Sequence, residues 1–137
     1  MSEYKELLYR LIECRPVTAD VSAVNQAENV MRDFLESRGL YCTMEVIDGR
    51  QTLYASTRPG KVQDVLLNAH LDVVPGGKGW TYPPFGAEIH DGKLYGRGVQ
   101  DDKGPTIGAI YGLKAIRELG LPVSRRIRVL FGTDEEN

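Results

Sequence analysis

The sequence predicts an α/β fold in which a mixed sheet with a parallel core lies between layers of helices, a three-layer α/β/α arrangement. Two continuous apolar runs, 65–67 and 129–131, are typical of strands that are covered on both faces. A helical stripe of apolar residues between them predicts a crossover helix, and therefore parallel strands. The pair Asp48-Gly49 separates two alternating segments, which indicates an antiparallel hairpin ahead of this core.

Each element has its own signal. Apolar residues recur at helical spacing over 4–12 and again over 24–35, which predicts two amphipathic helices. Asp20 or Ser22 can cap the second helix, and Gly39 suits the left-handed conformation that often follows a helix. The hairpin strands are expected over 40–46 and 51–57. The crossover helix, apolar on most sides, begins at Pro105 and ends before Gly120.

Composition excludes several classes of protein. The 137 residues include 17 Lys and Arg against 19 Asp and Glu, with no long basic run, so we expect no nucleic acid and no membrane partner. No apolar run approaches the ~20 residues that span a bilayer, and no signal-peptide region is evident. We therefore expect a cytoplasmic protein. Cys14 and Cys42 are isolated and are interpreted as small buried apolar residues.

Polar residues follow both apolar runs. His70 and Asp72 come after the first, Glu135 and Glu136 come after the second, and Asp101 lies just ahead of the crossover helix. The carboxyl ends of parallel strands meet at one edge of a sheet, which is where open α/β sheets bind their ligands. The sequence therefore predicts that these five side chains lie near one another.

Their chemistry fits a metal site. Asp72 can hold the His70 imidazole while the other ring nitrogen binds a cation. The glutamate pair can supply one ligand and one general base, and Asp101 can bridge two cations. Taken singly, these residues are better explained by a satisfied histidine, a solvated acidic turn and a helix cap. Their convergence favours a metal, because close carboxylates repel unless a cation compensates them.

Other motifs are assigned outside the site. His90 precedes a hairpin turn and is expected at an exposed strand end. The segment 96–98, Gly-Arg-Gly, is too short for a phosphate loop and indicates only backbone freedom. The long segment between the first apolar run and the crossover helix is expected to be packed by the cover residues Trp80, Pro83, Pro84 and Phe85. Arg97 has no assigned role.

Three motifs occur in order along the chain: HLDVVP at 70–75, YGRGVQDDKGP at 95–105 and GTDEE at 132–136. Together they resemble the di-zinc metallopeptidase and deacylase family that contains carnosinase-like and Xaa-His dipeptidases, acetylornithine deacetylase, succinyl-diaminopimelate desuccinylase and aminoacylase. The resemblance runs from about Tyr4 to the last residue. It is closest to the bacterial dipeptidase branch, and the deacetylase branch is the nearer alternative.

The resemblance implies a zinc-exopeptidase-like fold and a role for each residue. It implies that His70 ligates one zinc, Asp101 bridges two and Glu136 ligates the second, with Asp72 supporting His70 and Glu135 as general base and acid. Co²⁺ or Mn²⁺ are possible substitutes. The implied activity is hydrolysis of an amide bond in a dipeptide or small peptide by a metal-activated water. The alternatives are an N-acyl amino acid deacylase and a truncated module without catalysis.

Family members are several hundred residues long. We therefore expect residues 1–137 to be the amino-terminal part of a catalytic domain, without its remainder and without the lid and dimerisation domain. Each zinc would receive two ligands from this chain, whereas tetrahedral sites need more. Zinc is accordingly expected to be weak or absent in the fragment, which is expected to be inactive and to self-associate through an uncovered flank.

Overall fold

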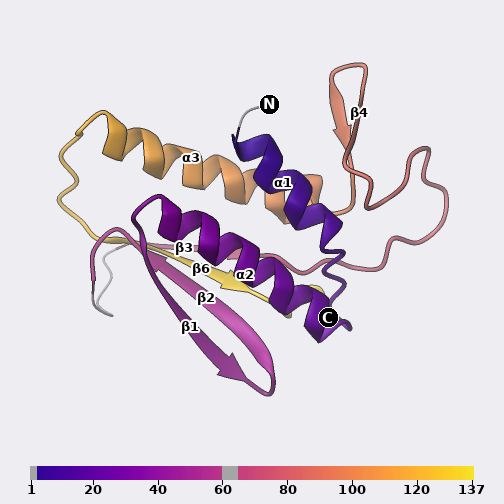
Figure 1. Cartoon of the computed structure of the whole chain (residues 1–137), viewed down its shortest axis with the longest axis horizontal. Helices are drawn as coiled ribbons and strands as arrows, with labels where there is room; N and C mark the ends of the chain where they lie inside the picture. Colours follow the sequence, from indigo (N-terminus) through magenta and orange to yellow (C-terminus); the bar gives the residue numbers. More distant parts are fainter. Residues whose placement is uncertain (1–2, 60–64) are drawn as a thin grey trace.

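A computed structural model describes residues 3–59 and 65–137 of the chain (Figure 1). Its elements, in chain order, are α1 (Glu3–Glu13), α2 (Val21–Ser37), β1 (Tyr41–Ile47), β2 (Arg50–Ser56), β3 (Val65–His70), β4 (Glu88–His90), β5 (Lys93–Tyr95), the short kinked turn η1 (Val99–Lys103), α3 (Gly104–Glu118) and β6 (Ile127–Gly132). Within these residues, no helix is both long and apolar enough to cross a lipid bilayer.

The main sheet has the strand order β1-β2-β6-β3. β3 and β6 are parallel neighbours, and β2 runs antiparallel to β6, so the predicted mixed sheet with a parallel core is confirmed. The last residues of the two parallel strands, His70 and Gly132, lie opposite each other. Because β2 is antiparallel to β6, its first residue, Arg50, lies at this same edge. The topology therefore brings three chain segments to one place.

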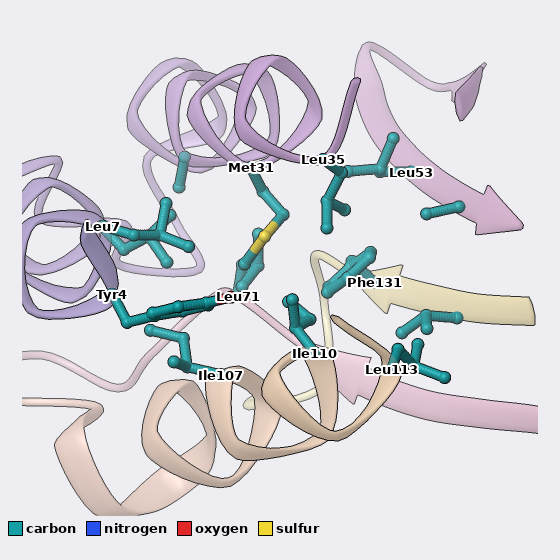
Figure 2. Close-up of a cluster of buried hydrophobic side chains, with 14 residues drawn as sticks. Tyr4, Leu7, Met31, Leu35, Leu53, Leu71, Ile107, Ile110, Leu113 and Phe131 are labelled. Carbon is teal, nitrogen blue, oxygen red and sulfur yellow. The ribbon is translucent and has the colours of Figure 1, made fainter. Parts of the chain in front are cut away.

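The helices pack together against one face of the sheet (Figures 1 and 2). Their shared core consists of Tyr4, Leu7, Leu11, Ala27, Met31, Leu35, Leu53, Ala55, Leu71, Ile107, Ile110, Leu113, Val129 and Phe131. Leu66 in β3 is 45% exposed, so the expectation that the parallel strands are covered on both faces was wrong for the described residues. The α/β class is confirmed, and the described part of the chain supplies two of the three expected layers.

The helix ends follow their predicted signals in part. Asp20, and not Ser22, caps α2, since its Oδ1 accepts a hydrogen bond from the Ala23 backbone N–H at 3.0 Å. Gly39 follows the helix with φ +76°. α3 buries only one face, and Tyr111 on another side is 44% exposed, so the prediction of a helix buried on most sides was wrong. Alanines and glycines on that helix made its apolar stripe look wider than it is.

The hairpin turn has the predicted residues in left-handed conformation, Asp48 with φ +50° and Gly49 with φ +80°. Asn25 of α2 holds this turn. Its Nδ2 donates to the Gly49 carbonyl at 2.8 Å, and its Oδ1 accepts from the Gln51 backbone N–H at 2.9 Å. The amino end of β2 is therefore fixed to the helical layer.

Arg97, which had no role assigned from the sequence, makes its contacts within the long segment between β3 and η1. Its guanidinium lies 5.2 Å from the centre of the Trp80 ring and donates to the Pro75 and Gly76 carbonyls at 3.3 Å, so it secures the predicted cover. His90 lies at the end of β4 and outside the donor group, as expected, but the prediction that it is exposed was wrong, because it is half-buried. It stacks on Tyr82 with ring centres 3.6 Å apart, since two aromatic rings bury more surface together than apart.

Cys14 and Cys42 are free and half-buried, which corrects the prediction that both are buried. Each packs against the rim of the core. Burial raises the pKa of both thiols, that of Cys42 to about 11, because the charged thiolate loses solvation. Both side chains therefore remain thiols at neutral pH.

Glu28 of α2 provides a stability prediction. It is fully buried, and neither carboxylate oxygen makes a hydrogen bond within the described residues. Burial raises the pKa of Glu28 well above its ordinary value; the nearby Leu53 backbone amide offsets part of this effect, and the Asp72 charge adds to it. A folded-state pKa above the unfolded one means that stability is lost as pH rises above the unfolded value, ~4.3.

We therefore expect Glu28→Gln to raise the free energy of unfolding at pH 7, on the order of 1–3 kcal/mol relative to wild type, because no buried carboxyl has to stay protonated or ionise. At pH 4 the two proteins should differ little. Urea denaturation at both pH values measures this difference. An equal effect of the substitution at pH 4 and pH 7 would contradict an ionisable origin.

Candidate metal centre

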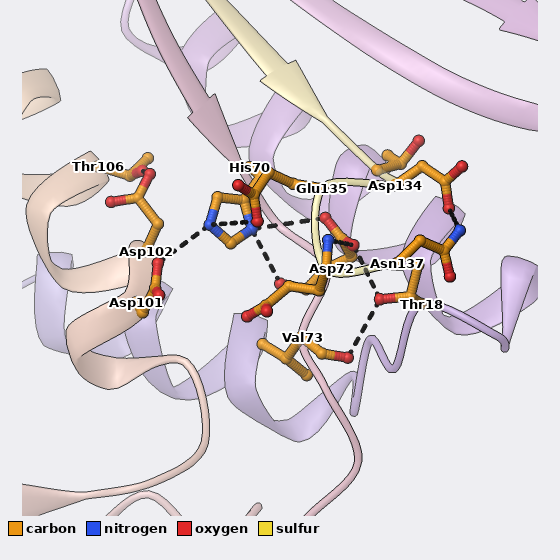
Figure 3. Close-up of polar contacts among 12 residues, drawn as sticks. Thr18, His70, Asp72, Val73, Asp101, Asp102, Thr106, Asp134, Glu135 and Asn137 are labelled. Atoms are coloured by element: carbon orange, nitrogen blue, oxygen red, sulfur yellow. Dashed lines mark hydrogen bonds and ion pairs between the residues drawn. The ribbon is translucent and has the colours of Figure 1, made fainter.

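His70 ends β3 with its two ring nitrogens facing different residues (Figure 3). Nδ1 lies 3.2 Å from the Asp72 backbone carbonyl and 3.5 Å from Asp72 Oδ1, whereas Nε2 lies 3.1 Å from Asp101 Oδ1. The spacing of two residues thus places Asp72 beside the ring, with the backbone carbonyl as its nearest acceptor. A proton on Nδ1 leaves the lone pair of Nε2 directed toward Asp101.

Asp72 is fully buried and joins three segments of the chain. Its Oδ2 accepts hydrogen bonds from the Thr18 hydroxyl at 2.8 Å and from the Glu136 backbone N–H at 3.1 Å. Its Oδ1 faces His70 and makes no hydrogen bond to any residue that the structure describes. One carboxylate therefore fixes the positions of His70 and of the chain at Glu136 relative to each other.

The two neighbouring aspartates point to different partners. Asp101 faces His70, and its side chain is 78% exposed. Asp102 instead accepts a hydrogen bond from the Thr106 hydroxyl at 3.1 Å, in the first turn of α3. Of the pair, Asp101 is therefore the residue available to the site.

Gly98 shows why this turn needs a glycine. Its φ is +84°, and an added Cβ would lie 2.7 Å from Lys103 Nζ and 2.8 Å from Val73 Cγ1. The Gly-Arg-Gly segment thus provides the backbone freedom that the sequence indicated, and Gly98 also allows a close approach of Lys103 and Val73. The tight turn brings Asp101 alongside His70.

Three donor residues come together at this edge of the sheet. One ligand atom from each of His70, Asp101 and Glu136 lies within 4.8 Å of the others. Imidazole nitrogen and carboxylate oxygen are ligands that zinc accepts at ~2.0–2.2 Å, so donors separated in this way can surround one cation. In the described part of the chain, this is the one group of at least three such residues.

Glu135 lies beside the donor group and not within it. Its Oε2 is 3.9 Å from His70 Nε2, and its side chain is 62% exposed. The structure therefore brings together all five residues singled out from the sequence. Their individual roles stay predictions.

The charges of the site act on two basic groups. Burial lowers the pKa of His70, but the Asp101 carboxylate, with Asp72 and Glu135, outweighs this effect and leaves the pKa raised. Lys103 is fully buried, and burial lowers its pKa to about 8, although the negative charges of Asp72 and Glu136 raise it in part. Lys103 Nζ makes no hydrogen bond within the described residues, so it acts on the carboxylates as a buried charge.

Sequence reasoning did not identify Lys103, Thr18 or Arg50 as parts of the site. The position of Lys103 inside the 95–105 motif, directly ahead of α3, could have pointed to it. No sequence pattern points to Thr18 or Arg50, because they reach the site only through contacts between segments distant in sequence.

The fold and the donor group together define an α/β protein with a candidate metal centre at the carboxyl edge of its parallel strands. Residues 66–137, which include the whole donor group, match peptidase family M20/M25/M40. This match spans more than half of the chain. The chain therefore belongs to peptidase family M20/M25/M40, and the resemblance seen in its three motifs is confirmed.

Curated relatives share the motif-bearing region. The chain is 51% identical over 79 residues to the putative dipeptidase YtjP of Bacillus subtilis (strain 168), an alignment that covers 57% of this chain and 17% of that protein. It is 48% identical over 68 residues to the Beta-Ala-Xaa dipeptidase of Lactobacillus delbrueckii subsp. lactis, covering 49% of this chain and 14% of that protein. The chain thus matches less than a fifth of the length of these relatives.

Solved structures confirm the fold. An M20 family metallo-carboxypeptidase, Sso-CP2 from Sulfolobus solfataricus, superposes with a TM-score of 0.87 at 22% identity, over 98% of this chain and 31% of that one. Human carnosine dipeptidase 1 superposes with a TM-score of 0.80 at 22% identity, over 96% of this chain and 32% of that one. The mixed sheet and its helices are therefore those of this structural class.

Proposed function

We propose that the protein hydrolyses an amide bond in a dipeptide or small peptide at a metal centre built on His70, Asp101 and Glu136. The observation that carries this proposal is the meeting of these donors, from three separate segments, within 4.8 Å at one sheet edge. Relatives named as dipeptidases support the substrate class. The cytoplasmic location and the self-association of residues 1–137 stay predictions.

The donor set fits zinc. In the proposed centre His70 would hold one zinc, Glu136 would hold a second and Asp101 would be shared between the two, with Co²⁺ or Mn²⁺ as possible substitutes. A bound zinc supplies Lewis acidity and lowers the pKa of water. Two zincs would share these three residues, so the complete centre needs further ligands, and weak binding to residues 1–137 alone stays a prediction.

The proposed roles of the other residues follow from their positions. Glu135 is exposed beside the donor group, where its carboxylate can take a proton from the attacking water and return it to the leaving amine. Asp72 faces Nδ1 of His70 and so keeps Nε2 turned toward the cation. Lys103 offsets the repulsion among the carboxylates.

A hydrolysis assay tests the proposal. The full-length gene product, stripped with a chelator, is given dipeptides, including one with an amino-terminal β-alanine, and N-acetyl amino acids, with or without added Zn²⁺, Co²⁺ or Mn²⁺. We expect metal-dependent hydrolysis of dipeptides. Hydrolysis of N-acetyl amino acids alone would identify a deacylase, and no hydrolysis of either would favour a non-catalytic module.

A further inference from the structure

The guanidinium of Arg50 joins two segments that lie far apart in sequence. Its Nη1 donates to the Thr133 carbonyl at 2.9 Å, and its Nη2 donates to the Thr18 carbonyl at 2.9 Å. Nη2 also lies 3.3 Å from Asp134 Oδ1. Arg50 therefore contacts the loop that leads directly into Glu135 and Glu136, although it is not one of their neighbours in sequence.

Arg50 is itself held in place. It is the first residue of β2, next to the turn that Asn25 secures, and its side chain is 23% exposed. Pairing of β2 with β6 fixes the strand relative to the loop that follows β6. The backbone that carries the guanidinium is thus held by strand pairing, and from this position the guanidinium donates to both carbonyls.

Thr18 continues the connection to the donor group. Its backbone N–H donates to the Val73 carbonyl at 3.1 Å, and its hydroxyl donates to Asp72 Oδ2 at 2.8 Å. Asp72 Oδ2 in turn accepts the Glu136 backbone N–H. The contacts form a closed ring: Arg50 holds Thr18 and Thr133, Thr18 holds Asp72, and Asp72 holds Glu136.

We propose that Arg50 is a positioning residue: with Thr18, it clamps the 133–136 loop so that the carboxylates of Glu135 and Glu136 face His70. This inference rests on the proposed function. Both ends of the loop are held through the backbone, Thr133 by Arg50 and Glu136 by Asp72. Glu135 is mostly exposed, so packing does not fix it, and the clamp sets its position.

The clamp needs the planar fork of arginine. Two carbonyls in different segments and one carboxylate are reached by two nitrogens of a single guanidinium. A lysine carries the same charge but ends in one compact ammonium, which cannot span both carbonyls. Arg50→Lys therefore separates the geometry of the clamp from its charge.

The test compares Arg50→Lys and Arg50→Ala with wild type in the full-length gene product. Arg32→Ala is the matched control, because Arg32 pairs with its neighbour Asp33 on the surface of α2. Amide exchange of Glu136 is measured by NMR without metal, and Co²⁺ affinity is measured from the visible absorption of bound Co²⁺. We expect exchange at Glu136 about tenfold faster in both Arg50 variants, and Co²⁺ affinity lower by about ten- to a hundredfold.

Two results would overturn the clamp formed by Arg50. Unchanged exchange at Glu136 in both Arg50 variants overturns the clamp, whatever the metal does. Full recovery of exchange and Co²⁺ affinity by Lys also overturns it, because charge alone would then suffice. If the Ala variant does not fold, the Lys variant decides. A wild-type protein that binds no Co²⁺ overturns the proposed metal centre, and exchange at Glu136 then decides on Arg50 separately.

Discussion

Replacing Glu135 with Gln is expected to lower kcat of the full-length gene product by about 10²- to 10⁴-fold while its zinc content stays at the wild-type value. Gln keeps the size of the side chain but cannot accept a proton from water. Glu135 Oε2 lies 3.9 Å from His70 Nε2, beside the donor group and not within it, so the substitution removes none of the three proposed ligands.

Metal content by plasma mass spectrometry and kcat on a dipeptide are measured on the same preparation. Glu6→Gln, which changes an exposed carboxylate on α1, is the matched control. Wild-type turnover in Glu135→Gln would remove Glu135 from the role of general base. Loss of zinc in this variant would instead make Glu135 a ligand.

Glu136→Ala is expected to have the opposite pattern, losing metal and activity together. The substitution removes one carboxylate from a group of three donor residues. Loss of a residue that only supports a ligand lowers metal affinity by about ten- to a hundredfold, so loss of a ligand should lower it by more than about a hundredfold. The backbone N–H of residue 136 still donates to Asp72 in this variant, which leaves the loop attached.

Equilibrium dialysis against zinc, followed by metal analysis, measures the loss. Two tightly bound zincs in Glu136→Ala would reject the ligand assignment. The pair of neighbouring substitutions is informative because both residues lie in one loop. A general disturbance of that loop would affect both variants alike. The assigned roles instead predict that Glu136→Ala loses metal and that Glu135→Gln keeps it.

Local sequence signals predicted most of the fold. The two helices, the Asp48-Gly49 hairpin and the parallel pair around 65–67 and 129–131 depend on spacing and turn chemistry within a few residues. The apolar runs misled on one point, because Leu66 is largely exposed. A run of three apolar residues cannot show whether both faces of a strand meet another layer.

For the candidate site too, sequence patterns predicted some residues and missed others. His70, Asp72 and the glutamate pair were accessible to sequence reasoning because they follow strands whose ends the topology brings together. Thr18 and Arg50 were not, because they reach the site only through contacts between segments distant in sequence, and the one sequence signal for Lys103 was its place inside the 95–105 motif. The buried ammonium of Lys103 and the forked contact of Arg50 appear only when the tertiary structure is known.

Anomalous diffraction from crystals of the full-length gene product grown with zinc, recorded on both sides of the zinc absorption edge, tests the metal centre most directly. We predict anomalous peaks at ~2.0–2.2 Å from His70 Nε2 and from the carboxylate oxygens of Asp101 and Glu136. Zinc peaks that contact none of these three residues, in crystals where the sheet edge is ordered, would contradict the proposed centre.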